Sequence, residues 1–264
     1  MSDTDRGEAL LARLEDLCGY AEQGMLGESC FLSPAELHLA KGHLARCVLS
    51  GGFLEWGGFE AADRKKIFVL PEYARNVKSY SELADYGFEN CICAVSVVGS
   101  GYRRLTHRDF LGAVLGLGID RRVLGDICFF DEEKPRVMIV CEEAIADFIA
   151  SELKKVGSDT VVSERMDIPD GFEPQRQFKH ISDTVASARA DCVVASLCSL
   201  SREKAKQTIE RGDLEIEYES EERVDRTVTA PCIITVRGYG KFKINSLSDK
   251  TKKGRYRLDA DKYM

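Results

Sequence analysis

Positively charged side chains at helical spacing mark the stretch from Arg189 to Gly212 as a candidate phosphate-binding surface. Arg202 and Lys206 stand four residues apart, so both project from one face of an expected helix. Lys204 belongs to the same helix, and Arg189 stands at the head of the helix before it. Guanidinium and ammonium groups bind phosphate oxygens. The stretch therefore predicts contact with the backbone of a nucleic acid.

Two short helices joined by a tight corner are expected to position these cations. Val193, Val194 and Leu197 mark the buried side of the first helix. Ser201 falls at the N-cap of the second helix, where its hydroxyl accepts a backbone N–H. Gly212 supplies the left-handed residue that ends it. Fixed cations on a helix pair favour structured RNA over single strands, because they read backbone shape.

A second group of cations follows the helix pair. Its members are Arg237, Lys241, Lys243, Lys252 and Lys253. Across a small sheet these side chains are expected to continue the surface of the helix pair. The alternative for the last two is a solvated tail. For Arg202 the alternative is an ion pair with Asp191 or Glu203 that only holds the corner together.

The distribution of charge decides where a polyanion could bind. The net charge of −7 alone argues against nucleic acid. Residues 179–264, however, hold 17 Lys and Arg against 14 Asp and Glu, a balance of +3, whereas the rest holds 20 against 30, a balance of −10. This asymmetry places an RNA site in the C-terminal part and leaves the acidic N-terminal half open to a protein partner.

The residue pattern offers no support for catalysis or metal binding. The 10 cysteines contain no Cys-x-x-Cys pair and the 4 histidines do not have zinc-ligand spacing, so reduced thiols and no metal are expected. His107-Arg108-Asp109 matches a kinase tripeptide by letters only and predicts a helix start. No apolar run approaches the ~20 residues that span a bilayer. We expect a cytoplasmic protein without membrane contact, cofactor or enzymatic activity.

Turn signals divide the chain into three small domains of an α+β protein. Residues 1–76 predict an N-terminal α/β unit, in which Phe53, Trp56 and Phe59 either stack on bases or close a core. The linker Pro169–Pro174 precedes the C-terminal domain, residues 177–264.

The middle domain, residues 77–168, predicts the order β-α-β-β-α-β of a ferredoxin-like (RRM-like) unit. It lacks a strand rich in aromatic residues, so base stacking on its sheet is not expected. Its stretch Gly99–Arg104 lies between a strand and a helix, which favours a turn with two exposed arginines, Arg103 and Arg104. Contact of these arginines with RNA is the alternative.

The C-terminal letters also resemble the S4 RNA-binding motif. The matching residues are Arg189-Ala190-Asp191, Ser201-Arg202, Ala205, Ile209, Gly212 and Leu214-Glu215-Ile216. With Thr184–Ser187 and Arg237–Phe242, the chain resembles the bacterial YlmH family of S4-domain proteins. Ala190 stands where the motif usually has Leu, and Glu217 where Asn often follows the strand.

The resemblance implies an S4 RNA-binding domain at residues 177–264 and binding to rRNA and tRNA. It further implies association with the large ribosomal subunit, a role in translation quality control and a link to cell division. The alternative is an RNA-modifying enzyme, of the pseudouridine synthase or rRNA methyltransferase type, with an appended S4 domain. Such an enzyme needs a catalytic signature, and residues 1–178 carry none.

Overall fold

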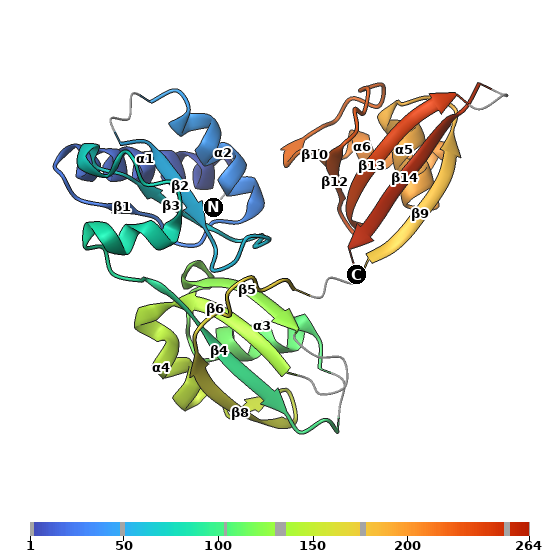
Figure 1. The fold of residues 1–264 in the computed structure, drawn as a ribbon. Helices are drawn as coiled ribbons and strands as arrows, with labels where there is room; N and C mark the ends of the chain where they lie inside the picture. Colours follow the sequence, from blue (N-terminus) through green and yellow to red (C-terminus); the bar gives the residue numbers. More distant parts are fainter. Residues whose placement is uncertain are drawn as a thin grey trace. The chain divides into compact units, whose positions relative to one another are not determined.

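The computed structural model describes residues 3–47, 51–102, 105–129, 136–174, 178–250 and 254–263 (Figure 1). The chain forms two compact units, residues 1–175 and 176–264. Both combine helices with antiparallel sheets, which confirms the predicted α+β class. No helix within the described ranges is long and apolar enough to cross a membrane.

The first unit contains four α-helices and two sheets among its described residues. Its helices are α1 (Asp3–Glu22), α2 (Pro34–Leu44), α3 (His107–Gly116) and α4 (Glu143–Glu152), with short 3-10 turns η1 (Glu72–Ala74), η2 (Tyr80–Tyr86) and η3 (Arg121–Val123). Its strands are β1 (Gly27–Glu28), β2 (Phe53–Trp56), β3 (Lys66–Val69), β4 (Ile92–Gly99), β5 (Leu124–Phe129), β6 (Arg136–Glu142), β7 (Lys155–Val156) and β8 (Asp159–Met166).

Local capping chemistry fixes where two of these helices begin. Ser33 caps α2 and exchanges hydrogen bonds with Glu36, and Pro34 takes the first helical position. Thr106 caps α3 and its N–H donates to the Asp109 carboxylate at 2.8 Å. Such paired bonds satisfy backbone groups that a helix start leaves without partners. The His107-Arg108-Asp109 stretch is therefore a helix start.

The second of these sheets has the strand order β5-β6-β4-β8-β7. Along the chain its elements follow β-α-β-β-α-β, with β7 added before the last strand. Helices α3 and α4 lie on one face of the sheet (Figure 1). Phe110 and Ile149 from the helices pack there against Val95 and Ile139 of the strands.

The opposite face of the same sheet packs partly against the N-terminal segment. Ile92 and Met138 of the sheet share one core with Phe31 and Phe68. Residues on both sides of the expected boundary at residue 76 thus bury a common surface, and the first 175 residues form one compact unit. A separate N-terminal domain of residues 1–76 stays a prediction.

The aromatic residues of the N-terminal segment line this core. Phe59 is buried, and its ring meets Phe172 edge-on at a centroid distance of 5.1 Å. Trp56 is half-buried and stacks on Tyr80 at 6.0 Å. These contacts favour the core interpretation over base stacking for both residues.

A buried lysine links the two sheets of the first unit. Lys66 on β3 is only 2% exposed, and its ammonium bonds Glu28 and, at 2.8 Å, Glu142. Burial opposes the charged form, but the bonds to Glu142 and Glu28 outweigh it and raise the pKa of Lys66. Because Glu142 ends β6, this ion triad joins the N-terminal strands to the second sheet.

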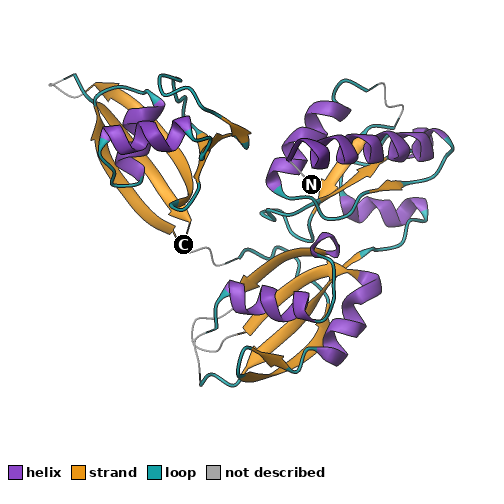
Figure 2. Ribbon diagram, turned by 180° about the vertical axis from the view of Figure 1, so that it is seen from behind, coloured by secondary structure: helices purple, strands orange, loops and turns teal. Residues whose placement is uncertain are grey.

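The second unit is one sheet covered by two helices. Its helices are α5 (Ala190–Leu197) and α6 (Arg202–Glu210), and its strands are β9 (Phe178–Val185), β10 (Leu214–Ile216), β11 (Glu219–Ser220), β12 (Cys232–Val236), β13 (Gly240–Lys250) and β14 (Tyr256–Tyr263). The strand order is β11-β10-β12-β13-β14-β9. Both helices lie on the same face (Figure 2), where Val193 and Ile209 pack on Ile234 and Phe242.

Candidate nucleic-acid interface

One buried carboxylate holds two arginines at the corner between α5 and α6. Asp191 is 4% exposed, and its two oxygens accept bonds from Arg189 Nε at 3.1 Å and from Arg202 Nε at 2.9 Å. The arginine side chains are 41% and 61% exposed. The sequence had offered phosphate binding and pairing with Asp191 as alternatives for Arg202. The geometry accommodates both, because each printed bond uses Nε and a guanidinium carries further N–H donors.

The charges of this cluster reinforce one another. Burial raises the pKa of the Asp191 carboxyl, but its bonds to Arg189 and Arg202 lower it further, so that the net shift is downward. The same bond raises the pKa of Arg202. The cluster therefore carries two positive charges and one negative charge across the neutral pH range.

The start of α5 is fixed by a neighbouring loop. The backbone N–H groups of Ala190 and Asp191 donate to the carbonyl oxygens of Arg226 and Val224, at 2.8 and 3.1 Å. Arg189 forms a bridge with Thr227. These bonds place the Asp191 carboxylate and hold the arginine that precedes α5.

Helix α6 presents further cations on its exposed side. Ser201 caps it by accepting the Lys204 N–H at 3.3 Å, as the sequence predicts. Lys204 and Lys206 are exposed, and Lys206 lies 3.8 Å from Glu210. Arg202, Lys204 and Lys206 thus share a helix whose opposite side, Ala205 and Ile209, packs into the core.

Lys241 and Lys243 do not extend that surface. They alternate along β13 with Phe242 and Ile244, whose side chains enter the core beneath the helices. Because successive side chains of a strand point to opposite faces, the two lysines lie on the face away from α5 and α6. The expected continuous surface is instead two basic regions on opposite faces of one sheet.

The sheet face away from the helices carries aromatic rings beside these lysines. The Lys241 ammonium lies 5.4 Å from the centroid of the Tyr218 ring and 4.9 Å from that of Tyr263. Tyr218 lies in the two-residue turn between β10 and β11. Both residues of this turn have positive φ, 50° at Glu217 and 67° at Tyr218, a geometry that usually requires Asn-Gly.

Glu217 holds this strained turn in place. Its N–H donates to the Ile233 carbonyl at 2.9 Å, and its carboxylate accepts the Ile233 N–H at 2.5 Å. The departure from Asn at position 217 therefore has a local role, bonding to β12.

The remaining predicted residues divide into described and undescribed positions. Arg237 is exposed in the turn between β12 and β13, and its N–H donates to the Asp213 carbonyl at 2.9 Å. Lys252 and Lys253 lie outside the described residues, as do Arg103 and Arg104. Within the described ranges, no group of three or more His, Cys, Asp or Glu side chains could hold a metal ion.

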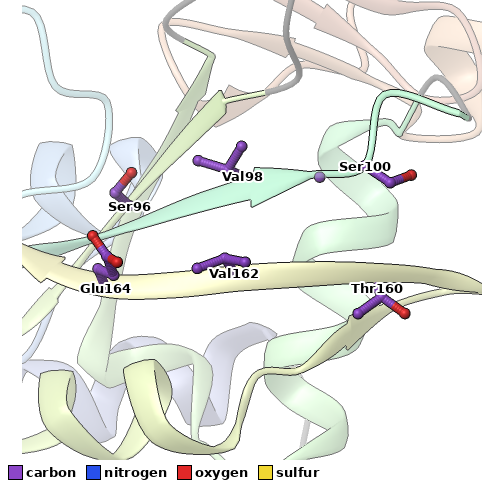
Figure 3. Close-up of a pocket in the computed structure, with 7 residues that line it drawn as sticks. Ser96, Val98, Ser100, Thr160, Val162 and Glu164 are labelled. Atoms are coloured by element: carbon purple, nitrogen blue, oxygen red, sulfur yellow. The ribbon is translucent and has the colours of Figure 1, made fainter.

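Sequence reasoning missed a second candidate region, a groove of about 340 Å³ on the first unit (Figure 3). It lies over β4 and β8, on the face away from α3 and α4. Its lining consists of Ser96, Val98, Gly99, Ser100, Thr160, Val162 and Glu164. A possible signal was Val162, an apolar side chain between the polar Thr160 and Glu164 on one strand face.

Comparisons with known proteins single out the same region. The sequence model of a family described as "Putative RNA-binding domain in YlmH" matches residues 85–170. The chain is 30% identical over 202 residues to the ribosome-associated protein quality control protein P2 of Bacillus subtilis (strain 168), across 76% of this chain and 74% of that protein. A solved structure, the cell division protein ylmH from Streptococcus pneumoniae, is 24% identical and covers 66% of this chain and 97% of that chain, with a TM-score of 0.49.

Proposed function

The chain belongs to the YlmH family, and from this premise we propose that it is a ribosome-associated RNA-binding protein whose residues 178–263 dock on structured RNA. The name of the B. subtilis relative supports a role in ribosome-associated quality control. Within that role, rRNA and tRNA of the large ribosomal subunit are the proposed targets.

The observation that carries the proposal is the cluster of Arg189, Asp191 and Arg202. A guanidinium that is already oriented loses less conformational entropy when it binds phosphate. Here one buried carboxylate orients two guanidiniums from the heads of two helices, with both side chains substantially exposed. This arrangement suits two neighbouring phosphates of a folded RNA backbone.

The order of elements supports an S4-like assignment of this unit. A helix pair, α5 and α6, precedes a short strand and a tight hairpin, as the motif requires. We propose the helix side, with Lys204 and Lys206 beside the arginine cluster, as the primary RNA surface. Lys241 and Lys243, with Arg237, Lys252 and Lys253, form a secondary basic region that increases affinity without sharing the primary contact.

An RNA-modifying enzyme is the alternative from another class, and we propose that the protein is non-catalytic. The exposed cations and the groove over β4 and β8 are suited to binding, and neither brings together a nucleophile with a general base. Incubation of the protein with ribosomal RNA tests this directly. Transfer of a methyl group, or conversion of uridine to pseudouridine, would reverse the proposal.

The experiment that tests RNA docking uses the full chain and three variants. Arg189→Gln and Arg202→Gln remove the proposed contacts. Arg223→Gln removes a similarly exposed arginine that pairs with Glu221 in a loop of the same unit. We expect the first two to lose co-sedimentation with ribosomes and the steep salt dependence of RNA binding, whereas Arg223→Gln retains both. Equal losses in all three variants would reject the assigned surface, and sequencing of crosslinked RNA identifies the target.

A further inference from the structure

The face of the second sheet of unit 1 that lies away from α3 and α4 is buried at one end and open at the other. Ile92 and Ala94 of β4 contribute to the core shared with the N-terminal segment. Further along the same strand, Val98 is 36% exposed, and its neighbour Val162 on β8 is 61% exposed. The open end coincides with the groove of about 340 Å³.

Matched cross-strand pairs build the floor of the groove (Figure 3). Val98 lies opposite Val162, and Ser96 lies opposite Glu164. In Figure 3, Ser100 and Thr160 lie together at the far end. An apolar centre is thus flanked by hydroxyl groups, a lining that accommodates a flat ring and hydrogen-bonds a sugar.

A cation stands beside the apolar centre. Arg136 begins β6 and lies opposite Val98 in the ladder, and its Nε donates to Ser96 Oγ at 3.2 Å. Its exposed position at this edge places a positive charge next to the valines. An anionic ligand with an apolar portion is favoured over a purely apolar one.

The loop at the far end is held rigidly and presents an aromatic ring. Asp159 is largely buried and accepts bonds from the N–H and hydroxyl of Ser100. Ser100 in turn accepts the Tyr102 N–H at 3.2 Å, and Tyr102 is 99% exposed. An exposed ring on a fixed backbone is a stacking platform for a base.

We propose that this open sheet face binds one unpaired RNA nucleotide, with the base against Val98 and Val162, the phosphate at Arg136, and an adjacent base on Tyr102. The proposal deepens the RNA-binding function and rests on it. It assigns single-stranded RNA to the first unit and folded RNA to the second. Because the linker around residues 169–177 joins both, each contact raises the effective concentration for the other.

The test is crosslinking of the full-length protein to a short RNA that contains 4-thiouridine. Peptide mapping should find crosslinks at residues 96–102 and 160–164. Val162→Glu introduces a carboxylate at an exposed position and should weaken these crosslinks and the affinity for the oligonucleotide about fivefold to tenfold, the range of one lost base contact. Leu115→Glu, an equally charged change on exposed α3, should leave them unchanged.

Substitution of the tyrosine adds a second, independent readout. Tyr102→Ala should lower oligonucleotide affinity severalfold, and Tyr102→Phe should restore it, because stacking needs the ring and not the hydroxyl. Fluorescence of Trp56, the one tryptophan in the sequence, reports that unit 1 stays folded in each variant.

Several outcomes would overturn the inference. Crosslinks confined to residues 178–263 would do so while leaving RNA docking by the second unit intact. Equal effects of Val162→Glu and Leu115→Glu would show that the groove is not the binding site. Benzoylphenylalanine at position 162 that crosslinks to a protein and not to RNA, in ribosome-bound complexes, would assign the groove to a polypeptide. Groove crosslinks that persist while Arg202→Gln retains full ribosome binding would instead reject the proposed function.

Discussion

Replacement of Asp191 by Asn gives opposite expectations for charge and for positioning. The substitution removes a negative charge from a proposed RNA-binding surface. Taken as a point charge about 7 Å from a phosphate in water, its removal should tighten RNA binding about twofold to threefold, and less at physiological salt. If the carboxylate instead orients Arg189 and Arg202, its loss should weaken binding.

The size of the positioning effect follows from the two bonds. Ordering a long side chain on binding costs about twofold to tenfold in affinity, and Asp191 orders two of them. We therefore expect Asp191→Asn to bind RNA roughly 5- to 50-fold more weakly, after the opposing charge effect is included. The second unit should also lose about 1–2 kcal/mol of stability, because the bonds are charge-assisted but both arginines are largely exposed.

The assay is fluorescence anisotropy with a labelled rRNA fragment at several salt concentrations. Calorimetry of the same samples gives the melting temperature of the second unit, so that affinity is expressed per folded molecule. Glu203→Gln is the matched control, because Glu203 is an exposed acid on the first turn of α6. It should tighten binding slightly. If folded Asp191→Asn binds as tightly as the unaltered protein, or more tightly, the positioning role is wrong.

Three further predictions address stability. Lys66→Ala leaves Glu28 and Glu142 without their buried counter-charge and should cost about 3–5 kcal/mol in urea unfolding followed by Trp56 fluorescence, whereas the apolar isostere Lys66→Met should cost clearly less; equal costs would contradict this. The folded-state pKa of Asp191 is depressed, so its contribution is present above its unfolded pKa of about 3.9 and is lost as pH falls through the folded value. The stability difference between wild type and Asp191→Asn should accordingly shrink below about pH 4, and a difference that stays constant down to pH 2 would exclude the ion pairs as its source. Replacing Glu217-Tyr218 by Asn-Gly should raise the stability of the second unit by about 1 kcal/mol, because relief of two left-handed residues exceeds the loss of one hydrogen bond; a lower melting temperature would show that the Glu217 bond dominates.

Features that depend on neighbouring residues were predictable from the sequence. The caps at Ser33, Thr106 and Ser201 require a specific side chain within three or four positions of the helix start, and the structure has all three. Gly212 has φ of 75° at the end of α6, as its position implies. Such signals are local, because one side chain satisfies backbone groups of its own turn.

Features that depend on distant packing were not predictable in the same way. Ile92 and Ala94 alternate with Cys93 and Val95, which indicates a strand buried on both faces. The sequence does not say what covers the second face, and the segment that does so lies more than 20 residues away. The Lys66 triad escaped notice for the same reason, since its carboxylates come from β1 and β6.

The sheet lysines were misplaced although their pattern contained the answer. Lys241 and Lys243 alternate with Phe242 and Ile244, and a sheet with one covered face must direct the apolar set towards its helices. Period-2 alternation therefore separates these lysines from Arg202 and Lys206. Proximity along the chain had suggested continuity, but the face of a strand is decided by parity.

The core shared between β4 and the N-terminal segment also sets a length limit. Because Ile92 and Ala94 are covered, the accessible part of the strand runs only from Ser96 to Ser100. Four residue steps at about 3.3 Å give roughly 13 Å of open track. The N-terminal segment thereby acts as a ruler: it leaves room for a single nucleotide and its immediate neighbour, and a longer strand would have to leave the sheet at Ser96.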